Sequence, residues 1–253
     1  MKQRLAAVAL LTLISATRSS ELPSVEANDN RTPAGTLEND TLKIRLVVSI
    51  GRWFPEAADG PHVDVAAFSE EGKAPNIPGP LIRVRTGTTV SATVRNDLTD
   101  STIWVRGLEA RPAKPDSVAL KPGETRKFTF RATSPGTFLY YARLGKVVAG
   151  GREREQIAGA FVVDPPGPVP PDRIMVINIW GDSIDRATYE RAFTINGKSW
   201  PFTERIHANI GDSLRWRVIN ASIRGHPMHL HGFYFRVDSR GSMVADTLYP
   251  EAR

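Results

Sequence analysis

The chain has 253 residues, which suits one large domain or two small ones and is long enough to bury a hydrophobic core. Hydrophobic residues make up 41% and charged residues 24% of the sequence, proportions that exclude an intrinsically disordered chain. The absence of cysteine excludes disulfides and zinc–thiolate sites, and the arginines behind the net charge of +6 are too scattered to indicate a nucleic-acid-binding face.

The N-terminal residues have the composition of a secretory signal peptide. Two basic residues, Lys2 and Arg4, precede a short apolar run at residues 5–16 that ends in a small residue. The run is too short for a good membrane span, and a buried N-terminal helix is the alternative. We therefore expect residues 1–20 to be a signal peptide, the mature chain to have no membrane span, and the protein to be exported to the periplasm or the extracellular space. Residues 21–40 are polar and turn-rich, and are predicted to be a flexible lead-in.

From residue 41 to residue 164 the sequence predicts strand after strand and no long amphipathic helix. Within residues 124–133, Phe128 and Phe130 alternate with polar residues, which is the period of a strand with one buried face. Turn residues separate such segments at intervals of roughly 8–12 residues, which is typical of a sandwich or barrel. The other strands are expected at residues 41–50, 81–98 (two strands), 102–108, 137–144 and 159–164.

A proline-rich segment then divides the chain. Residues 164–172, DPPGPVPPD, contain five prolines, which cannot continue the interior of a sheet, so we predict a stiff linker at 165–172. Strand patterns resume after it, at residues 173–180, 187–202, 211–222 and 229–238. Residues 84–97 and 207–222 share a glycine, a polar pair, an alternating strand and an asparagine, which indicates two copies of one fold.

We therefore predict an all-β protein with two β-sandwich domains, at residues 41–164 and 173–253. The second has only about 80 residues against about 125 in the first. An antiparallel sandwich needs its last strands to cover the core and to pair the sheet edges. The second domain is therefore predicted to be incomplete at its C-terminus.

Three of the five histidines stand within six residues, in the segment GHPMHLHG. In a strand His229 and His231 would share a face and His226 would lie on the other, because neighbouring side chains alternate. Imidazole is a suitable ligand for copper, zinc, iron or nickel, so the three histidines are candidate ligands of one or two metal centres. The alternative is a surface cluster, or histidines satisfied by hydrogen bonds in the core.

HPMHLHG is similar to the His-Pro-x-His-Leu-His-Gly motif of the multicopper oxidases, a laccase-like family built from cupredoxin domains. Residues 75–98 resemble the family's early Gly-Pro segment, residues 123–143 the stretch that leads to its second histidine pair, and residues 193–201 the Asn-Gly segment that opens a later domain. The resemblance implies two cupredoxin-like Greek-key β-sandwich domains, with copper as the cofactor.

The resemblance also implies roles for the three histidines. His226 would ligate the type 1 copper, which takes single electrons from a small-molecule or metal-ion reductant such as a phenol or an aromatic amine. His229 and His231 would ligate the trinuclear cluster, where O2 is reduced to water. The metals perform the redox chemistry, and the protein sets their geometry and potential.

The sequence departs from the family pattern in two places. Where the first domain of the family carries His-Trp-His-Gly and His-x-His, this chain has WVRG at residues 104–107 and YAR at residues 141–143. Arg106 and Arg143 are permanent cations that do not coordinate copper, so the first domain is predicted to hold no metal. The type 1 copper needs a cysteine thiolate, and the chain has none. We therefore expect no oxidase turnover from this chain alone.

Three hypotheses remain open. The chain is the N-terminal portion of an exported multicopper oxidase, in which a later domain donates the missing histidines, and a homo-oligomer forms through the missing-domain contacts. Alternatively it is a non-enzymatic cupredoxin-like copper-binding or scaffold protein, or a truncated product that does not fold fully. His62 and His207 match no ligand position of the family and are expected to be surface residues.

Overall fold

The structure is a computed structural model that describes residues 21–112, 116–145, 155–181, 191–222, 225–241 and 246–248. Throughout these ranges the regular elements are all strands, so the predicted all-β class is confirmed. In the same ranges there is no helix long and apolar enough to cross a membrane. The predicted signal peptide, residues 1–20, lies outside the described residues.

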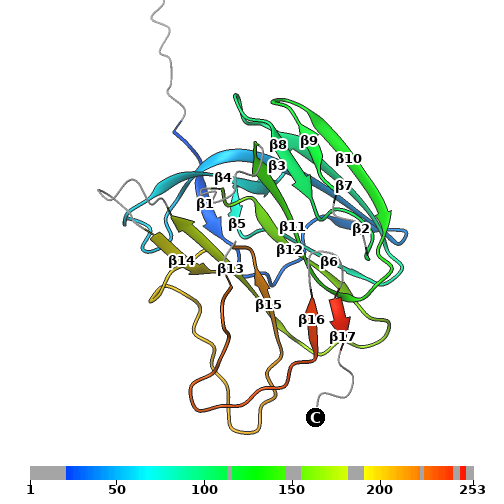
Figure 1. Cartoon of the computed structure of the whole chain (residues 1–253), viewed down its shortest axis with the longest axis vertical. Helices are drawn as coiled ribbons and strands as arrows, with labels where there is room; N and C mark the ends of the chain where they lie inside the picture. Colours follow the sequence, from blue (N-terminus) through cyan, green and yellow to red (C-terminus); the bar gives the residue numbers. More distant parts are fainter. Residues whose placement is uncertain are drawn as a thin grey trace, which may run out of the picture.

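The first part of the chain folds into two sheets packed face to face (Figure 1). One sheet has the order β1-β5-β4-β3-β7-β10, with β2 paired to β3, and the other has the order β6-β12-β11-β8-β9. The first sheet consists of β1 (Ser24–Ala27), β2 (Thr36–Glu38), β3 (Thr41–Trp53), β4 (Val63–Glu70), β5 (Asn76–Ile77), β7 (Thr89–Asn96) and β10 (Thr125–Arg131). The second consists of β6 (Gly79–Arg85), β8 (Ile103–Arg106), β9 (Val118–Leu120), β11 (Gly136–Leu144) and β12 (Ala158–Asp164).

The core between these sheets follows from the alternation seen in the sequence. Strand β7, TVSATVRN, buries every second residue against the opposite sheet. Near the middle of the sandwich Tyr140 is fully buried and donates a hydrogen bond to the carbonyl oxygen of Pro80 at 2.5 Å. Gly159 on the neighbouring strand leaves the space that this ring occupies, since a Cβ there would lie 2.4 Å from the Tyr140 ring.

Residues 21–40 are not the flexible lead-in that their composition predicts. Residues 24–27 form β1, which pairs in parallel with β3 and with β5, and residues 36–38 form β2, which pairs antiparallel with β3. The backbone amides of Glu26 and Asn28 donate to the carbonyls of Pro75 and Ile77 at 2.8 and 3.0 Å. Backbone hydrogen bonds and a single buried side chain, Val25, hold this segment in the sheet, and the polar composition of residues 21–40 as a whole does not reveal it.

After the proline-rich segment the chain forms a three-stranded sheet of order β14-β13-β15 and a separate hairpin, β16-β17 (Figure 1). The strands are β13 (Arg173–Gly181), β14 (Arg191–Ile195), β15 (Trp216–Asn220), β16 (Ser239–Gly241) and β17 (Asp246–Leu248). The predicted strand at 229–238 does not form. That segment makes only an isolated bridge between Leu230 and Phe233, since Gly232, with φ of +77°, turns the chain.

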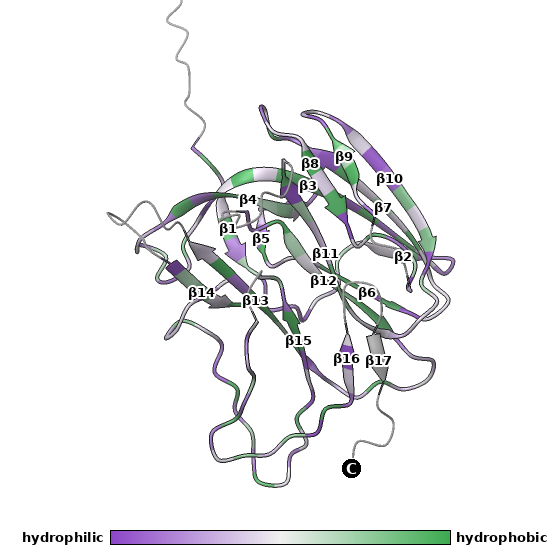
Figure 2. Ribbon diagram, in the orientation of Figure 1, coloured by the Kyte–Doolittle hydropathy of each residue, from purple (hydrophilic) through white to green (hydrophobic). Residues whose placement is uncertain are grey.

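One face of the three-stranded sheet packs on the outer face of the second sheet. Ile174, Val176 and Ile219 form an apolar cluster with Leu81 and Val162 of β6 and β12. The ribbon coloured by hydropathy shows apolar residues on both β13 and β15 (Figure 2). This contact buries Ile174, Val176 and Ile219, whereas Phe193, Ile195 and Val218 of the same sheet are exposed.

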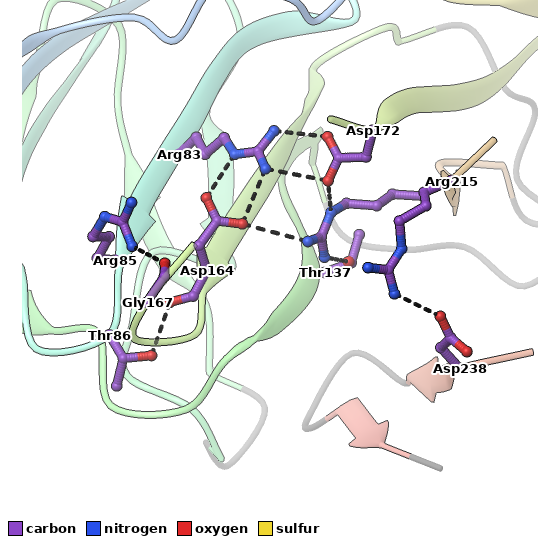
Figure 3. A network of polar contacts seen from close by, with 10 residues as sticks. Arg83, Arg85, Thr86, Thr137, Asp164, Gly167, Asp172, Arg215 and Asp238 are labelled. Carbon is purple, nitrogen blue, oxygen red and sulfur yellow. Dashed lines mark hydrogen bonds and ion pairs between the residues drawn. The ribbon is translucent and has the colours of Figure 1, made fainter. Parts of the chain in front are cut away.

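Two arginines hold both ends of the proline-rich segment (Figure 3). Arg83 of β6 binds Asp164 at 2.7 and 3.0 Å and Asp172 at 2.8 and 3.1 Å. Arg217 of β15 donates to Asp172 at 2.7 Å and to the hydroxyl of Thr137 at 2.7 Å. Burial raises the pKa of Asp172, but the hydrogen bonds from both arginines outweigh it and hold that pKa below its usual value. The network ties the first sandwich to the three-stranded sheet.

Candidate metal centre

His229 and His231 lie together on the exposed segment that follows β15. Their Nε2 atoms are 3.3 Å apart, and their ring centroids are 4.7 Å apart with an interplanar angle of 71°. A turn brings the two rings together: the amide of Phe233 lies 3.5 Å from the carbonyl oxygen of Leu230, and Gly232 adopts a left-handed conformation. The sequence predicts their proximity from the parity of a strand, but it is the turn that produces it.

This pair has the chemistry and spacing of two ligands of one copper ion. Neutral imidazole donates a ring nitrogen to copper. Two nitrogens bound at about 2 Å from one ion lie roughly 3.3 Å apart when the angle between them is near tetrahedral. Within the described ranges there is no group of three or more His, Cys, Asp or Glu side chains that could hold a metal ion. The pair therefore fits part of a copper site, and further ligands are needed to complete it.

His226 stands apart from this pair. Its Nε2 atom lies 2.8 Å from the hydroxyl oxygen of Ser222, which donates to Asn220 Oδ1 at 2.8 Å. The backbone amide of Ser222 also donates to Asn220 Oδ1, at 2.9 Å. His226 is half-buried, whereas His229 and His231 are exposed. The structure thus separates the three histidines into a pair and a single residue bound to Ser222, two residues past the end of β15.

A pocket of about 120 Å³ adjoins Ser222, at the contact between the first sandwich and the three-stranded sheet. Tyr141 and Arg143 of β11 line one side, and Asn178 of β13 and Ser222 line the other. The pocket therefore brings together the hydrogen-bond partner of His226 and one of the arginines that stand where the family has a histidine.

The two segments that depart from the family pattern lie side by side in the structure. Strands β8 and β11 are antiparallel, with Tyr141 opposite Arg106 and Arg143 opposite Trp104. The guanidinium carbon of Arg143 lies 5.5 Å from the centroid of the Tyr141 ring. Nothing in the local sequence signals this pairing, because the two segments are separated by about 35 residues that form other strands.

The two remaining histidines lie away from these sites. His62 is exposed, with its ring centroid 5.1 Å from that of Phe54, and His207 is exposed in the segment before β15. Neither joins a metal-binding group among the residues that the structure describes.

Comparison with known proteins agrees with the motif. Two family models, both described as multicopper oxidase, match residues 72–168 and 168–250. The chain belongs to the multicopper oxidase family. Membership confirms the resemblance seen in the motif segments, and it makes copper the expected cofactor.

Two curated relatives are similar to parts of this multicopper oxidase chain. The probable nitrite reductase-hydroxylamine oxidoreductase fusion protein of Kuenenia stuttgartiensis is 29% identical over 218 residues, which cover 76% of this chain and 25% of that protein. Copper resistance protein A of Escherichia coli is 27% identical over 133 residues, covering 47% of this chain and 21% of that protein. The chain thus spans a quarter or less of the length of these relatives.

Solved structures show the same fold. The blue copper oxidase of Nitrosomonas europaea is 25% identical with a TM-score of 0.53, and the match covers 72% of this chain and 61% of that one. The copper nitrite reductase of the same organism is 22% identical with a TM-score of 0.57, covering 82% and 78%. The second likeness supports the cupredoxin-like fold alone.

Proposed function

We propose that this protein is a copper-binding oxidoreductase of the multicopper oxidase type, with His226, His229 and His231 as copper ligands. The observation that carries the proposal is the pair of Nε2 atoms 3.3 Å apart on the HPMHLHG segment. Copper, when bound, supplies one-electron transfer and the reduction of O2 to water, with electrons from a phenolic, amine or metal-ion substrate. Nitrite, named in a relative, is the alternative electron acceptor.

The residues of this chain have three tasks in such a site. His229 and His231 would hold copper through neutral ring nitrogens, because only a deprotonated nitrogen can ligate. Ser222 fixes the ring of His226, as an outer hydrogen-bond partner orients a ligand. The turn at Gly232 keeps the Nε2 atoms of His229 and His231 3.3 Å apart, the spacing of two ligands.

We infer that the 253 residues by themselves turn over no substrate. The sequence offers no cysteine for a type 1 copper, and Arg106 and Arg143 stand where the family has histidines. We propose a domain boundary at residues 165–172, between cupredoxin-like domains at 41–164 and 173–253, with copper ligands only in the second. The missing ligands come from another polypeptide chain or from further domains of the complete protein.

A homo-oligomer is the partner that fits the exposed apolar surface. In the described ranges every exposed large hydrophobic side chain except Leu37 and Ile50 lies between Phe193 and Val237 in the sequence, the stretch that also carries the histidine pair. Such an apolar surface marks an interaction site. A second copy would cover it and could add ligands beside His229 and His231. The N-terminal composition further supports export to the periplasm or the extracellular space.

The alternative is a non-enzymatic copper-binding or scaffold protein, favoured by the two arginines in the first domain. Titration of the full chain with Cu²⁺, monitored by calorimetry and electron paramagnetic resonance, distinguishes the copper-binding oxidoreductase from the scaffold protein. We expect copper binding without an intense blue thiolate-to-copper absorption band, and no consumption of O2 with a phenolic reductant. A strong blue band, or oxidase turnover, would contradict the inferred inactivity of the chain.

A double variant tests the ligands themselves. His229→Ala with His231→Ala should weaken copper binding by at least about tenfold, because two donors are lost. His62→Ala with His207→Ala is the matched control, since it removes two exposed histidines outside the site. Equal copper affinity in the first double variant and the unaltered chain would overturn the assignment and favour the scaffold alternative.

A further inference from the structure

Four side chains on the outer face of strands β8 and β11 can all donate hydrogen bonds: Trp104, Arg106, Tyr141 and Arg143. The strand register places Arg106 opposite Tyr141 and Arg143 opposite Trp104. Directly opposite residues share a face of the sheet, so all four project from the same side. We call this set the arginine face.

The alternation of buried and half-buried residues along β8 and β11 shows which side of the sheet carries the arginine face. Val105, between Trp104 and Arg106, and Ala142, between Tyr141 and Arg143, are buried in the core of the sandwich. The arginine face therefore points away from that core. Tyr141 is 8% exposed, and the other three side chains are half-buried.

Among the described residues the donors of the arginine face have no acceptor. None of its four side chains makes a hydrogen bond or ion pair with the part of the chain that the structure describes, and the one contact within it is the stacking of Arg143 on Tyr141 at 5.5 Å. Guanidinium and indole groups donate only, and the tyrosine hydroxyl donates as well. The face therefore has a surplus of donors.

The positive charges of the two arginines also favour a bound anion. Arg106 and Arg143 are diagonal neighbours on adjacent strands, about 7–8 Å apart at the backbone, and both are permanently cationic. Two half-buried cations on neighbouring strands repel each other, and each loses hydration without gaining an ion-pair partner among the described residues. An anion bound between them removes both costs.

The nearby carboxylates are already engaged. Glu109 accepts from the amide of Gly107 at 3.0 Å and from Arg111 at 3.1 Å. Glu155 accepts from the amide of Leu144 at 3.1 Å. Glu109 acts on Arg106 only as a more distant charge, and Glu155 lines the same pocket as Arg143. Neither carboxylate is within ion-pair distance of Arg106 or Arg143, so within the described ranges no ion pair neutralises the face.

Space for a ligand lies beside it. Tyr141 and Arg143 also line the pocket of about 120 Å³ at the contact with the three-stranded sheet. We propose that the arginine face binds a small oxyanion, a carboxylate or a phosphate, between the guanidinium groups of Arg106 and Arg143. Both groups match the oxygens of such an anion in charge and geometry, and Tyr141 and Trp104 add an O–H and an N–H donor.

Calorimetric titration of the full chain with inorganic phosphate and with acetate, at constant ionic strength, tests this proposal. We expect at least one of them to bind, and Arg106→Gln and Arg143→Gln each to weaken that binding about tenfold through the loss of a charge-assisted hydrogen bond. Arg131→Gln is the matched control: it removes the same charge from an exposed position on β10 in the other sheet, and the affinity should not change. The probe that binds more tightly identifies the chemical class.

Thermal unfolding supplies a second readout. The bound anion should raise the midpoint of the unaltered chain but not that of the double arginine variant. Trp104→Phe, which keeps the aromatic ring, should weaken binding about threefold and serves if the arginine variants misfold. Three results would overturn the proposal: no binding of either probe, unchanged affinity in the double variant, or equal weakening by Arg131→Gln. Anion binding should survive the His229→Ala, His231→Ala substitutions, so its outcome is independent of the copper site.

Discussion

The substitution Asp172→Asn tests the network that joins the first sandwich to the three-stranded sheet (Figure 3). The Asp172 side chain is only 5% exposed and accepts from Arg83 at 2.8 and 3.1 Å and from Arg217 at 2.7 Å. Asparagine keeps one acceptor oxygen, loses the charge and directs an amide group at a guanidinium. Asp164 is then the one carboxylate that the network retains for its two arginines.

Removing one partner of a buried ion pair costs about 3–5 kcal/mol. The Arg83 and Arg217 side chains are 22% and 21% exposed, so water compensates part of the loss. We therefore expect Asp172→Asn to lower the free energy of unfolding by about 2–3 kcal/mol. Urea unfolding followed by circular dichroism measures this difference.

Glu38→Gln is the matched control. It removes a carboxylate from the Lys43–Glu38 pair, whose atoms are 2.7 Å apart but whose side chains are 62% and 53% exposed. Such a pair contributes little, and we expect a change of no more than about 0.5 kcal/mol. If Asp172→Asn cost no more than Glu38→Gln, the network would not hold the two parts together and the reasoning would be refuted.

The ionisation of Asp172 also makes the free energy of unfolding depend on pH. Because the pKa of Asp172 is lower in the folded chain than in the unfolded one, its contribution to stability is fully present above about pH 4. That contribution is lost as the pH falls through the folded-state pKa. The difference in unfolding free energy between the unaltered chain and Asp172→Asn should be constant from neutral pH down to mildly acidic pH and then shrink.

Three further substitutions test the packing and the exposed surface. Gly159→Ala would place a Cβ 2.4 Å from the fully buried Tyr140 ring, and should cost about 2–3 kcal/mol in urea unfolding. Trp53→Phe keeps an aromatic ring in the core but removes the indole hydrogen bond to the carbonyl oxygen of Gly197 at 3.0 Å. It should lower the free energy of unfolding by about 1–2 kcal/mol, and an unchanged value would show that this contact is dispensable. Phe193→Ser alters a side chain that is 55% exposed, so the unfolding free energy should stay within about 0.5 kcal/mol while sedimentation shows weaker self-association. Unchanged association would argue against an interface at this position.

Several features could be predicted from the sequence because they depend on residues that are close together along the chain. The alternation of β7 shows a strand with one buried face, and the prolines at 165–172 interrupt the strands between β12 and β13. The HPMHLHG segment identifies the family that the comparisons confirm. Residue types alone exclude copper ligands at Arg106 and Arg143, since guanidinium does not coordinate a metal.

Other features depended on segments that are far apart in the chain. Residues 24–27 become β1 because the backbones of β3 and β5 pair with them, and a segment of four residues with one buried side chain, Val25, is too short to predict a strand. Residues 229–238 have the alternation of a strand but pair with no neighbouring strand in the described structure, and the turn at Gly232 sets the histidine spacing instead.

The sequence by itself thus determined the all-β class, the family and the identity of the candidate copper ligands. Tertiary structure alone decided that Arg106 faces Tyr141, that Arg143 faces Trp104, and that Arg83 and Arg217 share Asp172. The physical reason is that strand register and ion pairing join backbones and charges separated by tens of residues. Local periodicity specifies which face of a strand is buried, but not which distant strand lies beside it.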